Sequence, residues 1–221
     1  MLNLLSIIIL SYLVGSIPTS IVLTKAIKGV DVRDYGSGNA GGTNVSRVLG
    51  KRFGLLVVIL DALKGVFAVV IISRLYLGSF PFPNTTPFDD FTLVQFIAGI
   101  TAVIGHIWTV FAGFKGGKGI ATGLGVFISI LTLDMLIGLG VFVIVTFVSK
   151  YVSLASISAA ITVPFMLIIR ENIFGVDIPS YGTVLPFAFL LALLVVYTHR
   201  ANIGRLIQGN ENKISFSKKK K

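Results

Sequence analysis

Long apolar runs, separated by short polar stretches, extend along the whole chain. Crossing a bilayer takes about 20 mostly apolar residues at ~1.5 Å each, and five runs meet that requirement. They cover residues 2–24, 53–77, 92–113, 152–169 and 182–199. A further apolar stretch, 120–149, has Asp134, Gly138 and Gly140 near its middle. It predicts either one long tilted helix or two short helices that turn near Asp134.

The first run carries two informative signals. No basic segment precedes it and no small-residue cleavage site follows it, which indicates a retained helix rather than a removed signal peptide. Pro18 interrupts the helical pattern and frees a backbone carbonyl, which nearby Ser and Thr hydroxyls can satisfy. We therefore expect a break in the first helix at Gly15-Ser16-Ile17-Pro18-Thr19-Ser20.

The composition is that of a membrane protein. The 221 residues are 54% hydrophobic and 13% charged, with a mean hydropathy of +0.92, whereas soluble domains are roughly 25% charged. The polar stretches leave no room for a separate soluble domain, so residues 1–221 predict one all-α polytopic membrane domain. The chain has no cysteine, which excludes disulfides, thiolate nucleophiles and cysteine metal sites.

Charge predicts the orientation, because cytoplasmic loops carry an excess of Lys and Arg. If the N-terminus lies outside and 120–149 crosses twice, about seven helices span the membrane, some of them short, and the C-terminus is cytoplasmic. The outer loops, 78–91 and 170–181, then hold Asp89, Asp90, Glu171 and Asp177. A single crossing would separate the Lys-rich tail, 212–221, from the other basic loops. The tail itself predicts attraction to anionic lipid.

A polar, glycine-rich segment, 36–47, links the first two runs; we call it the first loop. Glycines let backbone N–H groups approach a ligand, while polar side chains add further donors. The pattern predicts an anion site, with phosphate as the first candidate. The candidate ligands are Ser37, Gly38, Asn39, Gly41, Thr43, Asn44 and Arg47. The alternative is a flexible connector, and the missing Gly-Lys-Ser/Thr ending gives nucleotide hydrolysis no support.

A second loop of the same character, 114–119, leads into an apolar helix. A helix N-terminus preceded by glycines binds anions through its free N–H groups and its dipole. The candidates here are Gly116, Gly117, Lys118 and Gly119. Lys115 is typical of an ordinary cytoplasmic anchor, whereas Lys118, flanked by glycines on both sides, predicts a functional cation.

The segment 198–211 carries a third group of polar residues. His199, Asn202 and Arg205 recur at i, i+3 and i+6, which would place them roughly on one face of a continuing helix. His199 could act as a general base, donate to phosphate, or be a plain interfacial histidine. Glu211 is more typical of a residue that orients a basic side chain than of an acid catalyst.

Ionisable residues inside apolar spans are costly and are therefore candidates for function. Asp61 and Lys64 lie three residues apart on one helical face. They either neutralise each other or support the first loop, with Lys64 as a candidate phosphate ligand. His106, with Trp108, is typical of an interfacial pair with a structural role. Two serines that follow Lys150 could also face the site: Ser153 and Ser156.

Together, these segments resemble the PlsY family of bacterial acyl-phosphate:glycerol-3-phosphate acyltransferases. The resemblance covers most of the chain. It rests on GSIP at 15–18, GSGNAGGTNVSRVLG at 36–50, DALKG at 61–65, FKGGKGIATGLG at 114–125 and HRANIGRLIQGNE at 199–211. The departures are small and remove no polar group: Gly42 replaces the usual alanine, Ile120 the commoner valine and Asn210 a frequent threonine.

The resemblance implies transfer of a fatty acyl group from acyl phosphate to the 1-hydroxyl of glycerol 3-phosphate, in phospholipid biosynthesis. The products would be 1-acylglycerol 3-phosphate (lysophosphatidate) and phosphate. By motif position, it implies catalytic roles for Ser37, Arg47, Lys118, His199 and Asn202. It further implies no cofactor or metal, no nucleic-acid partner, a bacterial inner-membrane location with a cytoplasmic site, and a soluble acyl-phosphate synthase upstream.

An acyl phosphate is already activated, so no Ser–His–Asp triad is needed. Catalysis could consist largely of holding two anionic substrates together and stabilising the developing oxyanion. The hydroxyl proton goes either to His199 or to a substrate phosphate oxygen, and the phosphate is slightly favoured. The main alternative, a transporter for a phosphorylated small molecule, would have basic residues near the bilayer midplane and usually an internal repeat. A His-x-x-x-x-Asp acyltransferase is excluded, because neither His106 nor His199 has an aspartate five residues on.

Overall fold

The computed structural model describes residues 3–76 and 89–214, and the regular elements in these two ranges are all helices. The α-helices are α1 (Leu4–Ser16), α2 (Thr19–Lys28), α3 (Gly42–Val48), α4 (Lys51–Phe67), α5 (Asp90–Ile107), α6 (Ile120–Ile130), α7 (Thr132–Ser149), α8 (Val152–Ile168), α9 (Tyr181–Thr198) and α10 (Arg200–Ile207). The short 3-10 turns are η1 (Val32–Asp34), η3 (Ser73–Leu75) and η4 (Val110–Ala112), and the π-helical turns are η2 (Ala68–Ile72) and η5 (Ile169–Ile173).

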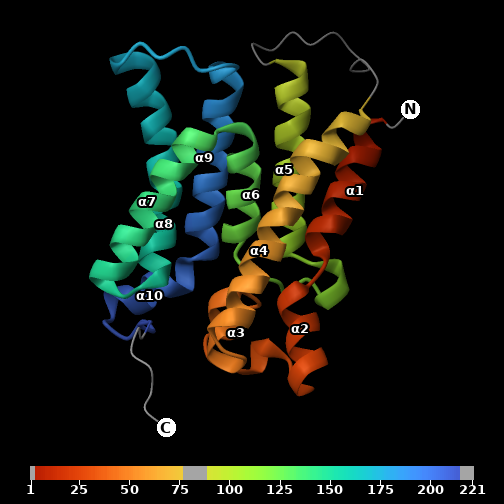
Figure 1. Cartoon of the computed structure of the whole chain (residues 1–221), viewed down its shortest axis with the longest axis vertical. Coiled ribbons are helices and arrows are strands. Elements are labelled where there is room, and N and C mark those ends of the chain that lie inside the picture. Colours follow the sequence, from red (N-terminus) through yellow and green to blue (C-terminus); the bar gives the residue numbers. More distant parts are fainter. Residues whose placement is uncertain (1–2, 77–88, 215–221) are drawn as a thin grey trace.

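The prediction of an all-α polytopic membrane protein is confirmed. Among the described residues, six helical segments are long and apolar enough to cross a bilayer: Leu4–Lys28, Lys51–Leu75, Asp90–Ala112, Thr132–Ser149, Val152–Ile173 and Tyr181–Thr198. The α6 helix is apolar but has only 11 residues. Figure 1 shows α2, α3 and α10 gathered at one end of the bundle, opposite the start of α1. The count of seven spans and their orientation stay predictions, as does the role of the tail, most of which lies outside the described residues.

The stretch 120–149 forms two helices, but they are unequal. The turn falls at Leu131, three residues before Asp134, so that α6 has 11 residues and α7 has 18. Asp134 lies in the first turn of α7, where a carboxylate interacts favourably with the helix dipole. It is 1% exposed and accepts a hydrogen bond of 2.5 Å from Arg170. Gly138 packs closely against α8 instead of forming the turn.

The first membrane helix is broken where Pro18 was expected to break it. The α1 helix ends at Ser16 and α2 begins at Thr19. The carbonyl of Ile17 accepts a 2.5 Å hydrogen bond from the ammonium of Lys64. Thr19 Oγ1 donates to Asp61 Oδ1 at 2.5 Å. The Ile17 carbonyl at the break therefore accepts from a lysine of α4 and from the backbone N–H of Thr19.

Small residues bring two pairs of helices into close contact. A Cβ atom at Gly15 of α1 would overlap the backbone of α5, and one at Gly65 of α4 would overlap the backbone of α6. Gly105 and Gly125 make the reciprocal contacts from α5 and α6. Membrane helices associate through such small residues, which allow backbones to approach. The result is that the loops following α2, α5 and α9 meet at one end of the bundle (Figure 1).

Candidate active site

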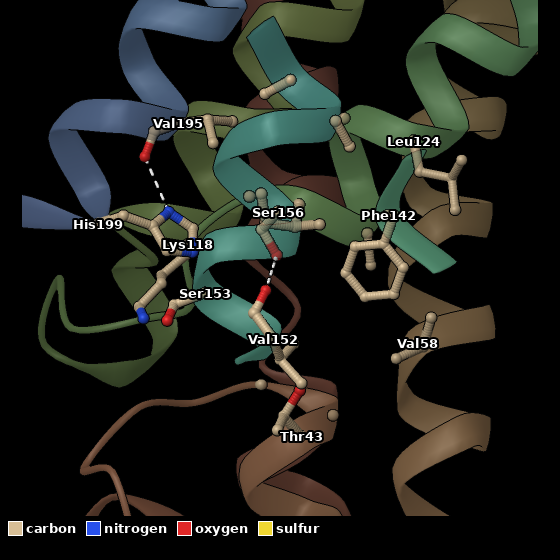
Figure 2. Close-up of a pocket in the computed structure, with 18 of the residues that line it drawn as sticks. Thr43, Val58, Lys118, Leu124, Phe142, Val152, Ser153, Ser156, Val195 and His199 are labelled. Atoms are coloured by element: carbon tan, nitrogen blue, oxygen red, sulfur yellow. Dashed lines mark hydrogen bonds between the residues drawn. The ribbon is translucent and has the colours of Figure 1, made fainter. Parts of the chain in front are cut away.

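A cavity of about 280 Å³ lies where the three polar segments meet the helices. Its polar residues come from segments far apart in the sequence: Ser37, Asn39, Thr43, Asn44, Arg47, Asp61, His106, Lys118, Ser153, Ser156, His199, Asn202, Glu211 and Asn212. Its apolar residues come from α4 to α9, and include Val58, Val103, Leu124, Phe127, Met135, Leu139, Phe142, Leu191 and Val195. Figure 2 shows His199, Lys118 and Ser153 together on one side, with Leu124, Phe142 and Val58 on the other.

The first loop is held in shape by the side chain of Asn44. This side chain is buried, and its Nδ2 group donates to the carbonyls of Val32 and Tyr35, both at 2.8 Å, and of Asn39 at 3.1 Å. Its Oδ1 accepts from the backbone N–H of Ser37 at 3.1 Å. Asn44 was predicted as a phosphate ligand, but these bonds occupy its amide. Its place in the structure is that of an internal support for the loop.

Several other predicted first-loop residues do reach the cavity. Ser37, Asn39, Thr43 and Arg47 line it, together with Gly41, the residue that precedes α3. Gly38 does not line it, and its φ of +69° shows why a glycine stands there. The loop thus presents hydroxyl, amide and guanidinium groups to the cavity from one wall.

The second loop is built differently, because its glycines bond to α5. Gly116 N–H donates to the Ile107 carbonyl at 2.9 Å, and Gly117 N–H donates to the His106 carbonyl at 3.0 Å. A Cβ atom at either glycine would overlap His106. Neither glycine lines the large cavity, so the structure gives both a packing role rather than the predicted phosphate contact. Gly119, with a φ of +81°, lines the cavity and starts α6.

Lys118 points into the cavity, and its ammonium donates to Asn202 Oδ1. Burial lowers the pKa of Lys118 to about 8, and the nearby positive charges of Arg205 and Arg47 lower it further against the opposing effect of Glu211. The side chain is thus still a cation at neutral pH, but one that an anionic ligand would stabilise. Such a poised cation is typical of a functional site.

Glu211 connects the third segment to α8. Its carboxylate accepts hydrogen bonds from Asn202 Nδ2 at 2.7 Å, from Arg205 Nε at 2.7 Å and from Ser153 Oγ at 3.1 Å. Burial alone would raise the pKa of Glu211, but these hydrogen bonds and the charge of Arg205 lower it overall. Glu211 therefore orients a basic side chain, as the sequence indicated, and Arg205 contacts it instead of lining the cavity.

His199 stands at the break between α9 and α10 and is 2% exposed. Its Nδ1 lies 2.8 Å from the Val195 carbonyl, which can only accept, so Nδ1 carries the proton. Burial and the charge of Lys118 lower the pKa of His199 to about 4. The imidazole is therefore neutral at physiological pH, with Nε2 as an acceptor. Although the helix breaks here instead of continuing, His199 and Asn202 still line one cavity.

The remaining predicted residues divide into two groups. Ser153 and Ser156 line the cavity, as expected, and Ser156 Oγ donates to the Val152 carbonyl at 2.9 Å. Lys64 does not line it, because its ammonium is bonded to Ile17, Thr19 and Asp61 inside the bundle. Asp61 and His106 do line it. The sequence assigned them no contact with the site, although their position in apolar spans was a usable signal.

Comparison with known proteins decides the family. A family model described as glycerol-3-phosphate acyltransferase matches residues 5–209. The chain belongs to the glycerol-3-phosphate acyltransferase family. It is 46% identical over 239 aligned positions to a glycerol-3-phosphate acyltransferase of Chlorobium phaeobacteroides, with 99% of each chain covered. It is 44% identical to that of Chlorobaculum tepidum, with 99% of this chain and 100% of the other covered.

Two solved structures are similar to this acyltransferase-family protein over nearly its whole length. Both are crystal structures of PlsY, described as an integral membrane glycerol 3-phosphate acyltransferase. The glycerol 3-phosphate form gives a TM-score of 0.81 at 38% identity, with 96% of each chain covered. The lysophosphatidic acid form gives 0.78 at 37% identity, with 96% and 95% covered. These similarities confirm the PlsY family as the correct assignment.

The cavity unites the five residues that the family motifs single out. Ser37, Arg47, Lys118, His199 and Asn202 all line it, although they come from three segments of this glycerol-3-phosphate acyltransferase family member. The polar end offers two cations, Arg47 and Lys118, with hydroxyl and amide donors between them. The apolar end offers a lining suited to a hydrocarbon chain. One site can therefore hold a phosphate and an acyl chain together.

Proposed function

We propose that this protein transfers a fatty acyl group from acyl phosphate to the 1-hydroxyl of glycerol 3-phosphate. The products are 1-acylglycerol 3-phosphate and inorganic phosphate. Membership of the glycerol-3-phosphate acyltransferase family supports acylation of glycerol 3-phosphate. The observation that carries the proposal is the single cavity whose cationic, donor-rich end continues into an apolar end between the helices.

The residues of the cavity favour an activated acyl donor. Among the described residues that line it, no serine, histidine and carboxylate are hydrogen-bonded together as a catalytic triad, and His199 is oriented by a backbone carbonyl. Acyl phosphate needs no enzyme nucleophile, because phosphate is already a good leaving group. The site then has to bring two anions together, which explains why Arg47 and Lys118 face one cavity.

The reaction is a direct acyl transfer. The 1-hydroxyl oxygen of glycerol 3-phosphate attacks the acyl carbonyl, the C–O bond to phosphate breaks, and phosphate leaves with the bonding electrons. The hydroxyl proton passes to a substrate phosphate oxygen. This route is favoured because a histidine with a pKa of about 4 is a weak base. Lys118 and Asn202 hold the phosphate of glycerol 3-phosphate, while Ser37 and Arg47 hold the acyl phosphate.

The helices and charges of the protein support a location. The chain is a multi-pass membrane protein. We propose that it resides in the bacterial inner membrane, with the cavity opening to the cytoplasm and the acyl chain lying toward the bilayer. A soluble acyl-phosphate synthase is the partner that would supply the donor.

The test uses the purified full-length protein in lipid. It is incubated with radiolabelled glycerol 3-phosphate and either acyl phosphate, acyl-CoA or acylated carrier protein. We expect labelled lysophosphatidate with acyl phosphate alone. Product only with acyl-CoA would overturn the proposed donor. Uptake of glycerol 3-phosphate into vesicles without any acylation would favour the transporter alternative.

A further inference from the structure

The imidazole of His106 lies between the two glycine loops. It is 8% exposed and comes from the last turn of α5. A Cβ atom at Gly117 would overlap His106 Nε2 and would lie 2.8 Å from the carbonyl oxygen of Ala40 in the first loop. The backbones of both loops therefore meet at the edge of this ring. Gly117 directly precedes Lys118, so the position of the ring affects the position of the Lys118 backbone.

A buried carboxylate, itself paired with a lysine, faces the other edge of the ring. His106 Nδ1 lies 3.6 Å from Asp61 Oδ1, and that same oxygen accepts a 2.6 Å hydrogen bond from Lys64 and a 2.5 Å bond from Thr19. Lys64 also holds the Ile17 carbonyl at the break between α1 and α2. The side chains of Asp61 and Lys64 are 3% and 6% exposed, so this network is locked inside the bundle.

We propose that His106 is a positioning residue that sets the spacing between the two glycine loops, with Asp61 and Lys64 fixing its ring. This inference rests on the proposed function, because the loops are taken to hold the phosphates of the two substrates. The bonding pattern supports it: Gly117 N–H donates to the His106 carbonyl, so both the backbone and the ring of one residue hold the second loop. A shift of about 1 Å at such a site can change a rate a hundredfold.

The test is a double-mutant cycle on the reconstituted full-length protein, read as the KM for glycerol 3-phosphate at saturating acyl phosphate. His106→Ala removes the ring, and Gly117→Ala adds the methyl group that meets it. We expect each single change to raise the KM about tenfold. The double variant should have a KM no higher than that of Gly117→Ala, because loss of the ring relieves the closer of the two contacts of the new methyl group and leaves only the one with the Ala40 carbonyl. Independent effects would multiply to about a hundredfold.

Gly116→Ala is the matched control. Its added methyl group would meet the backbone carbonyl of His106, which remains when the ring is removed. The KM changes of Gly116→Ala and His106→Ala should therefore multiply. KM does not depend on the folded fraction of a preparation, so partial misfolding does not blur the comparison. Multiplication in the Gly117 pair as well would overturn the positioning role.

A second variant tests the buried charges without leaving either one unpaired. Asp61→Asn combined with Lys64→Met removes both, which avoids the large cost of a lone buried charge. We expect the KM for glycerol 3-phosphate to rise several-fold, with no further rise when His106→Ala is added. A KM equal to that of the wild type would overturn the role of the pair. If the wild-type protein makes no lysophosphatidate, the proposed function fails; if it is active and the cycles multiply, only this inference fails.

Discussion

The two glycine loops resemble each other in sequence but are built by opposite means. A side chain shapes the first loop from within, since the buried amide of Asn44 bonds to two backbone groups of the loop and to two carbonyls just before it. The second loop is shaped from outside, because Gly116 and Gly117 donate to the end of α5. In the first loop the support is one residue that can be removed. In the second it is the close approach of two backbones, with the His106 ring beside them.

This difference shows that a glycine-rich loop can contribute to a cavity in two ways. The first loop keeps several polar groups on the cavity wall, whereas the second delivers one lysine side chain to it. We therefore expect substitutions in the first loop to affect both architecture and chemistry. Substitutions at Lys118 should affect the charge of the cavity and the hydrogen bond to Asn202.

The largest effect is expected at Arg47, which supplies the cation of the first loop. Arg47→Ala should lower kcat/KM by about 10²–10³-fold, the range observed when a preorganised charge-stabilising donor is removed. The measurement is steady-state acyl transfer with the purified protein. Arg52→Ala is the control, because Arg52 is exposed at the start of α4 and does not line the cavity. An equal loss in both variants would contradict a specific role for Arg47.

The second largest effect is expected for Asn44→Ala, which removes the side chain that supports the first loop. The carbonyls of Val32, Tyr35 and Asn39 would lose their partner, so we expect a loss of about 2 kcal/mol in the free energy of unfolding. We also expect a fall in kcat of about tenfold or more. Thermal unfolding in detergent and initial-rate assays measure the two effects. Full activity together with unchanged stability would show that the loop does not depend on this amide.

The pH dependence of the second loop should be set by Lys118. Its pKa in the free enzyme is lowered to about 8, so the cation is present below that pH and is lost above it. We expect kcat/KM for glycerol 3-phosphate to fall about tenfold per pH unit above this value. Lys118→Arg should remove the alkaline fall, because arginine stays charged. A fall that persists unchanged in Lys118→Arg would assign it to another group.

The smallest effect is expected at His199. With a pKa of about 4 it is neutral between pH 6 and 9, so His199→Gln should lower kcat about tenfold or less and leave the shape of the pH profile unchanged. The measurement is kcat against pH for both proteins. Loss of activity together with a missing basic group in the profile would make His199 the proton acceptor, and substrate-assisted transfer would be wrong.

The sequence predicted the fold well where one physical rule applies along the chain. Length and hydropathy located the membrane helices, and Pro18 located the break in the first of them. The unequal sizes of α6 and α7 were not predicted, and neither was the pairing of Asp134 with Arg170, which comes from a different helical segment. A local pattern contains no information about such a partner.

The site was predictable as a set of residues but not as a set of roles. Topology alone places the three polar segments at one end of the bundle, so Ser37, Lys118 and Asn202 were correctly expected together. The pattern of residues cannot tell whether a backbone N–H or an amide is free. Gly117 and Asn44 were predicted as phosphate ligands, but in the structure their N–H groups bond to the protein itself. Lys64 was predicted as a phosphate ligand, but its ammonium donates to acceptors inside the bundle.

The bond between Lys118 and Asn202 joins residues 84 positions apart, and Glu211 fixes Asn202 from nine positions further on. During synthesis, both glycine loops are therefore made long before the ribosome has added the residues that complete the cavity. We accordingly expect a chain that ends before Glu211 to lack a complete site.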